Sequence, residues 1–131
     1  MSRRASPPSI TRALSVRQPY IELILAGRKT IEYRSRATRV RERVYLYASQ
    51  IPGPACAFTD AELSREELPI GLILGSVEIT NCVRGEEFYE WQLARPERLT
   101  KPLKPTRRPQ PMFFFPFAVP DDSPERRRTN P

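Results

Sequence analysis

The chain has 131 residues, with 22 Lys and Arg against 15 Asp and Glu, a formal charge of +7, and no histidine. This length accommodates one small domain with a single core. The absence of histidine excludes Ser-His-Asp triads, Cys-His dyads and the usual His-containing zinc sites, so any catalysis must use other side chains.

Cysteine content and hydropathy indicate the compartment. Cys56 and Cys82 are too few for a disulfide framework, and we interpret them as free thiols in a reducing environment. No apolar run approaches the roughly 20 residues of a membrane span, and the basic N-terminus precedes no hydrophobic signal segment. We therefore expect a soluble, cytoplasmic protein with no membrane partner. No motif indicates a metal ion or an organic cofactor.

The N-terminal part predicts a strand followed by a helix. Residues 1–11 are basic and rich in Pro and Ser, which predicts a disordered tail. Ala13–Val16 is typical of a short strand. A helix is predicted over Gln18–Gly27, since Pro19 suits a first helical position and Gly27 supplies a left-handed stop.

Two further strands are predicted around a basic connection. Lys29 to Arg34 reads as a half-buried strand in which Ile31 and Tyr33 alternate with polar residues. The basic stretch 36–43 can be a solvated linker or the electrostatic rim of a site, and the pattern leaves both open. Val44 to Ser49 repeats the alternation and predicts a second strand.

The middle of the chain predicts a helix and a long bent strand. Asp60 is a plausible N-cap for a helix over Ala61–Leu68, which Pro69 would end. Gly71–Cys82 should form the longest strand. Gly75 within it indicates a bulge or a close backbone approach.

The C-terminal part predicts one more strand, Tyr89–Leu93, in which Trp91 is interpreted as a core residue. Lys101–Pro111 holds four prolines and predicts an extended surface crossing. Met112–Phe117 is apolar and should close the core, and residues 119–131 predict a disordered tail. Because short strands outnumber helices, the predicted fold class is α+β, with a small barrel and one or two helices.

One stretch concentrates residues capable of chemistry, in the pattern Gly27-x-Lys29-x-x-Glu32-x-Arg34. The two-residue period of a strand places Glu32 and Arg34 on one face, and Lys29 can approach Glu32 only from the turn after Gly27. The pattern alone leaves two interpretations open. It is either a solvated face of mixed charges or a functional site.

This pattern, with Ser35 after it, Ala13–Tyr20 before it and Val44–Ser49 beyond it, resembles the ASCH domain of the PUA-like superfamily. Looser similarity continues through Gly71–Cys82, the Trp91 strand and Phe113–Phe117. The resemblance covers about residues 12–118, which we expect to form one domain.

The resemblance implies a PUA-like β-barrel with helices at its openings and a cleft beside the motif. Such relatives commonly bind RNA, so RNA or another single-stranded nucleic acid is the expected partner, and a monomer is favoured. Arginine and lysine can hold phosphate, and tyrosine can stack on an unpaired base. The residues expected to bind nucleic acid are Arg17, Tyr20, Lys29, Glu32, Arg34, Arg36, Tyr47 and Ser49, with Gly27 setting the turn.

Three positions depart from what the resembled family often has. Tyr20 stands in place of Trp, Arg36 in place of an aromatic residue, and Tyr47 in place of His. A tyrosine at position 47 can still stack on a base and donate a hydrogen bond.

Two alternatives to a binding module stay open. The first is a small hydrolase, a ribonuclease or an amidohydrolase of an acylated or modified nucleoside, with catalytic Lys29, Thr30 and Glu32. A lysine paired with Glu32 would be a poor base unless substrate separates the two. The second alternative is a coactivator-like protein-interaction module in which Phe113–Phe115 and the proline-rich stretch dock a partner.

Overall fold

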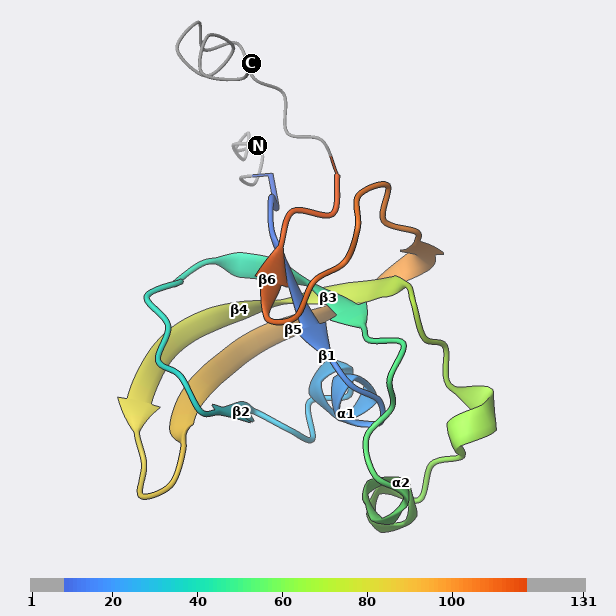
Figure 1. Ribbon diagram of the computed structural model, residues 1–131, viewed down its shortest axis with the longest axis horizontal. Helices are drawn as coiled ribbons and strands as arrows, with labels where there is room; N and C mark the ends of the chain where they lie inside the picture. Colours follow the sequence, from blue (N-terminus) through green and yellow to red (C-terminus); the bar gives the residue numbers. More distant parts are fainter. Residues whose placement is uncertain (1–8, 118–131) are drawn as a thin grey trace, which may run out of the picture.

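The computed structural model describes residues 9–117, which form a curled six-stranded sheet with two short helices (Figure 1). Most of the tail predicted over residues 1–11, and all of that over 119–131, lies outside the described residues. Within residues 9–117 no helix has the length and apolar character to cross a membrane. In chain order the elements are β1 (Ala13–Val16), α1 (Tyr20–Leu25), β2 (Ile31–Arg34), β3 (Arg43–Ala48), α2 (Ala55–Ala61), a 3-10 turn (Arg65–Glu67), β4 (Ile73–Arg84), β5 (Tyr89–Leu103) and β6 (Phe113–Phe114).

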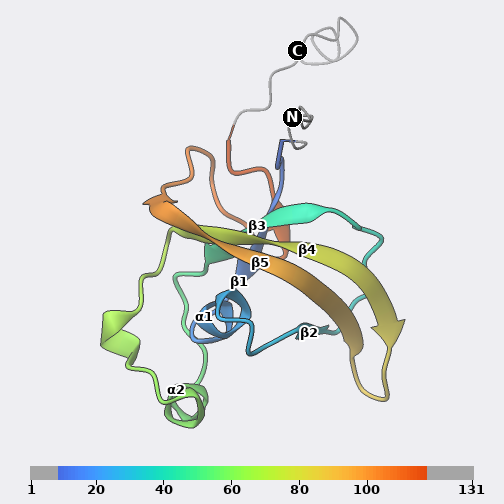
Figure 2. The ribbon, with the colours of Figure 1, turned by 180° about the vertical axis from the view of Figure 1, so that it is seen from behind.

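The sheet has the strand order β2-β5-β4-β3-β1-β6, in which β1 and β3 are parallel and all other neighbours are antiparallel. The long β4–β5 pair curves over the length of the molecule (Figure 2). The predicted α+β class is confirmed. The ladders of the described residues begin at β2 and end at β6, so the sheet is a curled half-barrel, and the expected closed barrel is not confirmed.

The concave side of the sheet holds the core, as the apolar alternation predicts. Trp91 is fully buried, and its ring stacks on Phe113 with centroids 5.5 Å apart. Phe114 is also buried, so most of the predicted aromatic segment closes the protein's own core. Phe115 stays 46% exposed.

Both predicted helices differ from those observed. The first is shorter, because Gln18 is buried and its amide donates to the Pro69 carbonyl (3.0 Å), leaving only Tyr20–Leu25 helical. The prediction of a helix over Ala61–Leu68 capped by Asp60 is wrong. Asp60 lies inside α2, which starts after Pro54 and ends at Glu62 in a left-handed conformation. The observed helix buries Phe58 and Ala61, whereas the predicted helix began at Ala61 and left Phe58 outside.

Strand β5 runs ten residues past its predicted end at Leu93, into the expected proline-rich crossing. Prolines are tolerated in a strand where pairing is interrupted. Pro96 and Pro102 fall in two register shifts of the β4–β5 ladder, between the paired residues Ala94 and Glu97 and between Arg98 and Leu103. The bulges therefore let a proline-containing segment continue the sheet.

Gly75→Ala is expected to lower the free energy of unfolding by about 1–3 kcal/mol. Gly75 lies at one of these register shifts, and a methyl group there would overlap the Glu97 carbonyl oxygen and the Leu25 side chain. Urea denaturation measures the loss.

The control position is Gly27, where φ is 78° and a methyl group meets nothing within 4 Å. Asparagine tolerates a left-handed backbone, so Gly27→Asn should be milder than Gly27→Ala. Gly75→Asn should be worse than Gly75→Ala, and the opposite order would contradict a steric cause.

Candidate functional site

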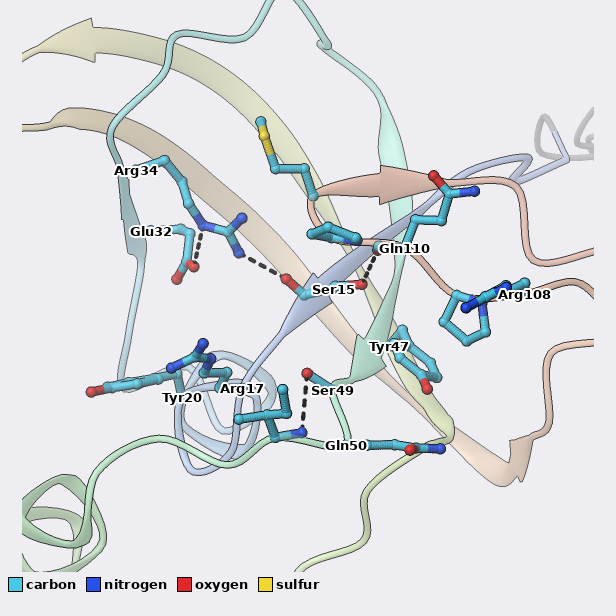
Figure 3. Close-up of a pocket in the computed structure, with 14 residues that line it drawn as sticks. Ser15, Arg17, Tyr20, Glu32, Arg34, Tyr47, Ser49, Gln50, Arg108 and Gln110 are labelled. Carbon is cyan, nitrogen blue, oxygen red and sulfur yellow. Dashed lines mark hydrogen bonds and ion pairs between the residues drawn. The ribbon is translucent and has the colours of Figure 1, made fainter.

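A cleft of about 700 Å³ opens where β1 and β3 end, bounded by β2 on one side and by the segment between β5 and β6 on another (Figure 3). This volume is within the usual range of ligand pockets, about 300–1,000 Å³. Six residues singled out in the sequence line the cleft. They are Arg17, Tyr20, Glu32, Arg34, Tyr47 and Ser49.

The remaining predicted residues lie outside this cleft. Gly27, Lys29 and Thr30 line a separate cavity of about 190 Å³. Arg36 lies in the β2–β3 connection, where its backbone carbonyl accepts a hydrogen bond from the Trp91 indole nitrogen (2.9 Å). Gly27 has the positive φ that the predicted turn requires.

The motif forms a bridge across the open side of the curled sheet. Glu32 is 8% exposed and accepts a 2.8 Å hydrogen bond from Arg34 Nε. Arg34 Nη2 donates to the Ser15 carbonyl (2.8 Å), so β2 and β1 are joined although they are not neighbours in the sheet. The guanidinium carbon also lies 5.4 Å from the Trp91 ring centroid. Side-chain contacts thus join β1 and β2, which no backbone hydrogen bonds of the sheet connect.

The two faces of β2 are the reverse of the expectation from the alternation. The polar face, with Glu32 and Arg34, points toward the cleft, whereas Tyr33 is 52% exposed. The physical reason is that the buried side of this strand borders a cleft and an ion pair, and not an apolar core.

Lys29 acts as a cation and a donor in this arrangement. Its Nζ donates to the Ile31 carbonyl (2.6 Å) and lies 3.6 Å from a carboxylate oxygen of Glu32. The same atom lies 5.6 Å from the ring centroid of Tyr20 and 5.2 Å from that of Tyr33. These contacts use the charge and hydrogens of an ammonium group, whereas a general base needs a free lone pair. Hydrolysis through Lys29 and Thr30 stays a prediction, and this geometry does not favour it.

Tyr47 contributes a fixed hydroxyl to the cleft. It is 3% exposed, and its ring packs edge-on against Phe114 with centroids 5.3 Å apart. Burial raises the pKa of Tyr47 above its ordinary value, so the hydroxyl stays neutral well beyond neutral pH. The site can therefore offer a hydrogen-bond donor there without adding a charge.

The cleft is positively charged. Its acid, Glu32, is held between Lys29 and Arg34. Arg17, just after β1, and Arg108 are exposed, and neither side chain makes an ion pair or hydrogen bond within residues 9–117. Two guanidinium groups are thus free to meet an anion.

The lining residues that the sequence analysis missed come mainly from the segment between β5 and β6. Ser15 places this segment, because its hydroxyl donates to the Gln110 carbonyl (2.7 Å) and its amide to the Met112 carbonyl (2.8 Å). The sequence does contain a signal, since Arg108 and Gln110 alternate with prolines. The stretch that holds them was interpreted only as a surface connection. The missed residues are Ser15, Gln50, Ile51, Arg108, Pro109, Gln110, Pro111 and Met112.

Comparison with known protein families supports the resemblance that the motif suggested. The model of the ASCH domain matches residues 14–109, which cover the sheet except β6 and the first residue of β1 and include eleven of the fourteen residues that line the cleft. A search of curated proteins finds no match to the chain.

Proposed function

The chain belongs to the ASCH domain family, and from this membership and the geometry of the cleft we propose that it binds single-stranded nucleic acid, with RNA as the favoured ligand. The observation that carries the proposal is the pair of unpartnered, exposed arginines, Arg17 and Arg108, that line one cleft within the described part of the chain. Two free guanidinium groups in one concave site favour a ligand with more than one negative charge.

Phosphate recognition falls to the exposed arginines. A guanidinium group presents two parallel N–H donors that match phosphate oxygens. Arg17 and Arg108 have this capacity free, whereas Arg34 already donates to Glu32 and to the Ser15 carbonyl. Arg34 therefore shapes the wall, and the two exposed arginines contact the backbone of the ligand.

Base recognition falls to the polar and aromatic lining. Unpaired bases are read by stacking on flat side chains and by hydrogen bonds to their edges. Tyr20 offers a partly exposed ring, and Ile51, 63% exposed, offers an apolar surface beside it. Gln50, Ser49 and the neutral Tyr47 hydroxyl can donate to or accept from a base edge.

The double variant Arg17→Ala/Arg108→Ala is expected to weaken binding of a fluorescein-labelled oligouridylate by at least about tenfold, the loss of two charge-assisted contacts. The plot of log affinity against log salt should become shallower by about 0.7 for each phosphate contact removed. Fluorescence anisotropy across a salt series measures both quantities.

Arg65→Ala is the matched control, because Arg65 is exposed on the 3-10 turn and does not line the cleft. It removes one positive charge, half of what the double variant removes, without removing a proposed contact. If Arg65→Ala and the cleft double variant lose the same affinity for each charge removed, the effect is one of overall charge. Absence of oligouridylate binding by the unmodified protein would overturn the proposed function.

A further inference from the structure

A second basic surface lies outside the cleft, on the connection between β2 and β3. This connection covers residues 35–42 and carries Arg36, Arg39 and Arg41, all exposed. In Figure 1 it rises from β2 to β3 across the long β4–β5 ribbon. None of its residues lines the cleft.

The connection is held in shape by contacts at both ends. The Trp91 indole donates to the Arg36 carbonyl (2.9 Å), and Val40 is half-buried against the core. The Val40 amide donates to the Thr38 hydroxyl (3.1 Å). Val40 packs against the core, whereas Arg39 and Arg41 on either side of it are exposed.

The arginines of this connection are not equivalent. Arg41 Nη1 donates to the carbonyls of Thr38 (2.8 Å) and Val40 (3.0 Å), so it is used to shape the loop. Arg36 and Arg39 make no side-chain hydrogen bond or ion pair within residues 9–117. The one acid of the loop, Glu42, pairs with Arg12 (2.9 Å) and does not neutralise them.

This surface begins where the cleft ends. Arg34 lines the cleft, and Arg36 follows it two residues later, in the bend directly after β2. Figure 3 shows the chain leaving the cleft directly after Arg34 toward this connection. The first exposed arginine of the connection thus lies two residues from the wall of the cleft.

We infer that Arg36 and Arg39 form a second contact surface for the same nucleic-acid strand, so that the protein binds the part inside the cleft and the phosphates that continue over the β2–β3 connection. This inference rests on the proposed function. It requires that a trinucleotide is bound by the cleft alone, whereas a longer strand also reaches Arg36 and Arg39.

The test compares fluorescein-labelled uridine trinucleotide and uridine dodecanucleotide binding to the full chain by anisotropy over a salt series. The variants are Arg36→Ala/Arg39→Ala, Arg17→Ala and the control Arg65→Ala. We expect Arg36→Ala/Arg39→Ala to weaken dodecanucleotide binding several-fold and to reduce its salt slope by about 1.4, two contacts at about 0.7 each, with trinucleotide binding unchanged. Arg17→Ala should weaken both ligands.

Each other outcome has a separate meaning. If Arg36→Ala/Arg39→Ala matches Arg65→Ala on the dodecanucleotide while Arg17→Ala weakens both ligands, the second surface is overturned and the proposed function stands. If it weakens the trinucleotide equally, the two arginines belong to the cleft rim, and the separate surface is overturned. If neither ligand binds the unmodified protein, both proposals fail. The variant Arg36→Lys/Arg39→Lys keeps the charge and should retain most dodecanucleotide affinity, which separates a charge effect from a folding defect.

Discussion

Arg34→Met is expected to lower the free energy of unfolding by about 3 kcal/mol, because it breaks a mostly buried ion pair from one side. The side chains of Arg34 and Glu32 are only 19% and 10% exposed, and their closest atoms are 2.8 Å apart. Methionine keeps the aliphatic stem of arginine as far as the Nε position, so the change removes the guanidinium group with its charge and hydrogen bonds and keeps most of the packing of the stem. Glu32 would keep only Lys29, at 3.6 Å, and the Ser15 carbonyl would lose its donor.

Chemical denaturation measures this loss, and Arg95→Met is the matched control. The Arg95–Glu78 pair is as short, at 2.7 Å, but its side chains are 63% and 36% exposed. Exposed pairs contribute about 0–1 kcal/mol, so the control should change stability little. If both variants lose equal stability, the bridge between β2 and β1 contributes no more than a surface contact.

Local features of the fold could be predicted from the sequence because local physics sets them. The strand over Ala13–Val16 and the left-handed turn at Gly27 follow from alternation and from glycine's freedom at positive φ. The irregularity at Gly75 was also predicted, and the β4–β5 register shifts there. In each case the deciding interaction lies within a few residues.

The features that could not be predicted depend on partners far away in the chain. The strand character of residues 94–103 depends on two bulges in its pairing with β4, which no pattern within the segment reveals. The place of Gln110 beside the cleft depends on Ser15, 95 residues earlier. Eight of the fourteen lining residues were missed, and five of these eight belong to this segment between β5 and β6.

The motif itself illustrates the same limit. Its sequence predicted that Glu32 and Arg34 share a face, and they do. It did not predict that Arg34 would reach the Ser15 carbonyl or that Lys29 would lie between Tyr20 and Tyr33. The residues of a site can thus be named from spacing, whereas their separate roles require the contacts.

Trp91→Leu is expected to lower the free energy of unfolding by about 3–5 kcal/mol, since it removes a large, fully buried side chain and leaves a cavity. It also removes the stack on Phe113 and the donor to the Arg36 carbonyl. Urea denaturation measures the change. A loss of stability below about 1 kcal/mol would contradict the inference that the buried Trp91 ring is a main support of the core.

Because the Trp91 ring lies under the Arg34 guanidinium, Trp91→Leu and Arg34→Met should not be additive. Residues in contact show coupling energies of about 0.5–3 kcal/mol in double-mutant cycles, whereas distant sites add. A cycle of Arg34→Met with Ile73→Val, a core substitution in the separate cluster around Phe114, is the control and should be additive. Equal coupling in both cycles would mean general destabilisation. Coupling confined to the cycle with Trp91 would mean that the core, the cleft wall and the start of the β2–β3 connection form one unit. Trp91 contacts each of them, through Phe113, Arg34 and the Arg36 carbonyl.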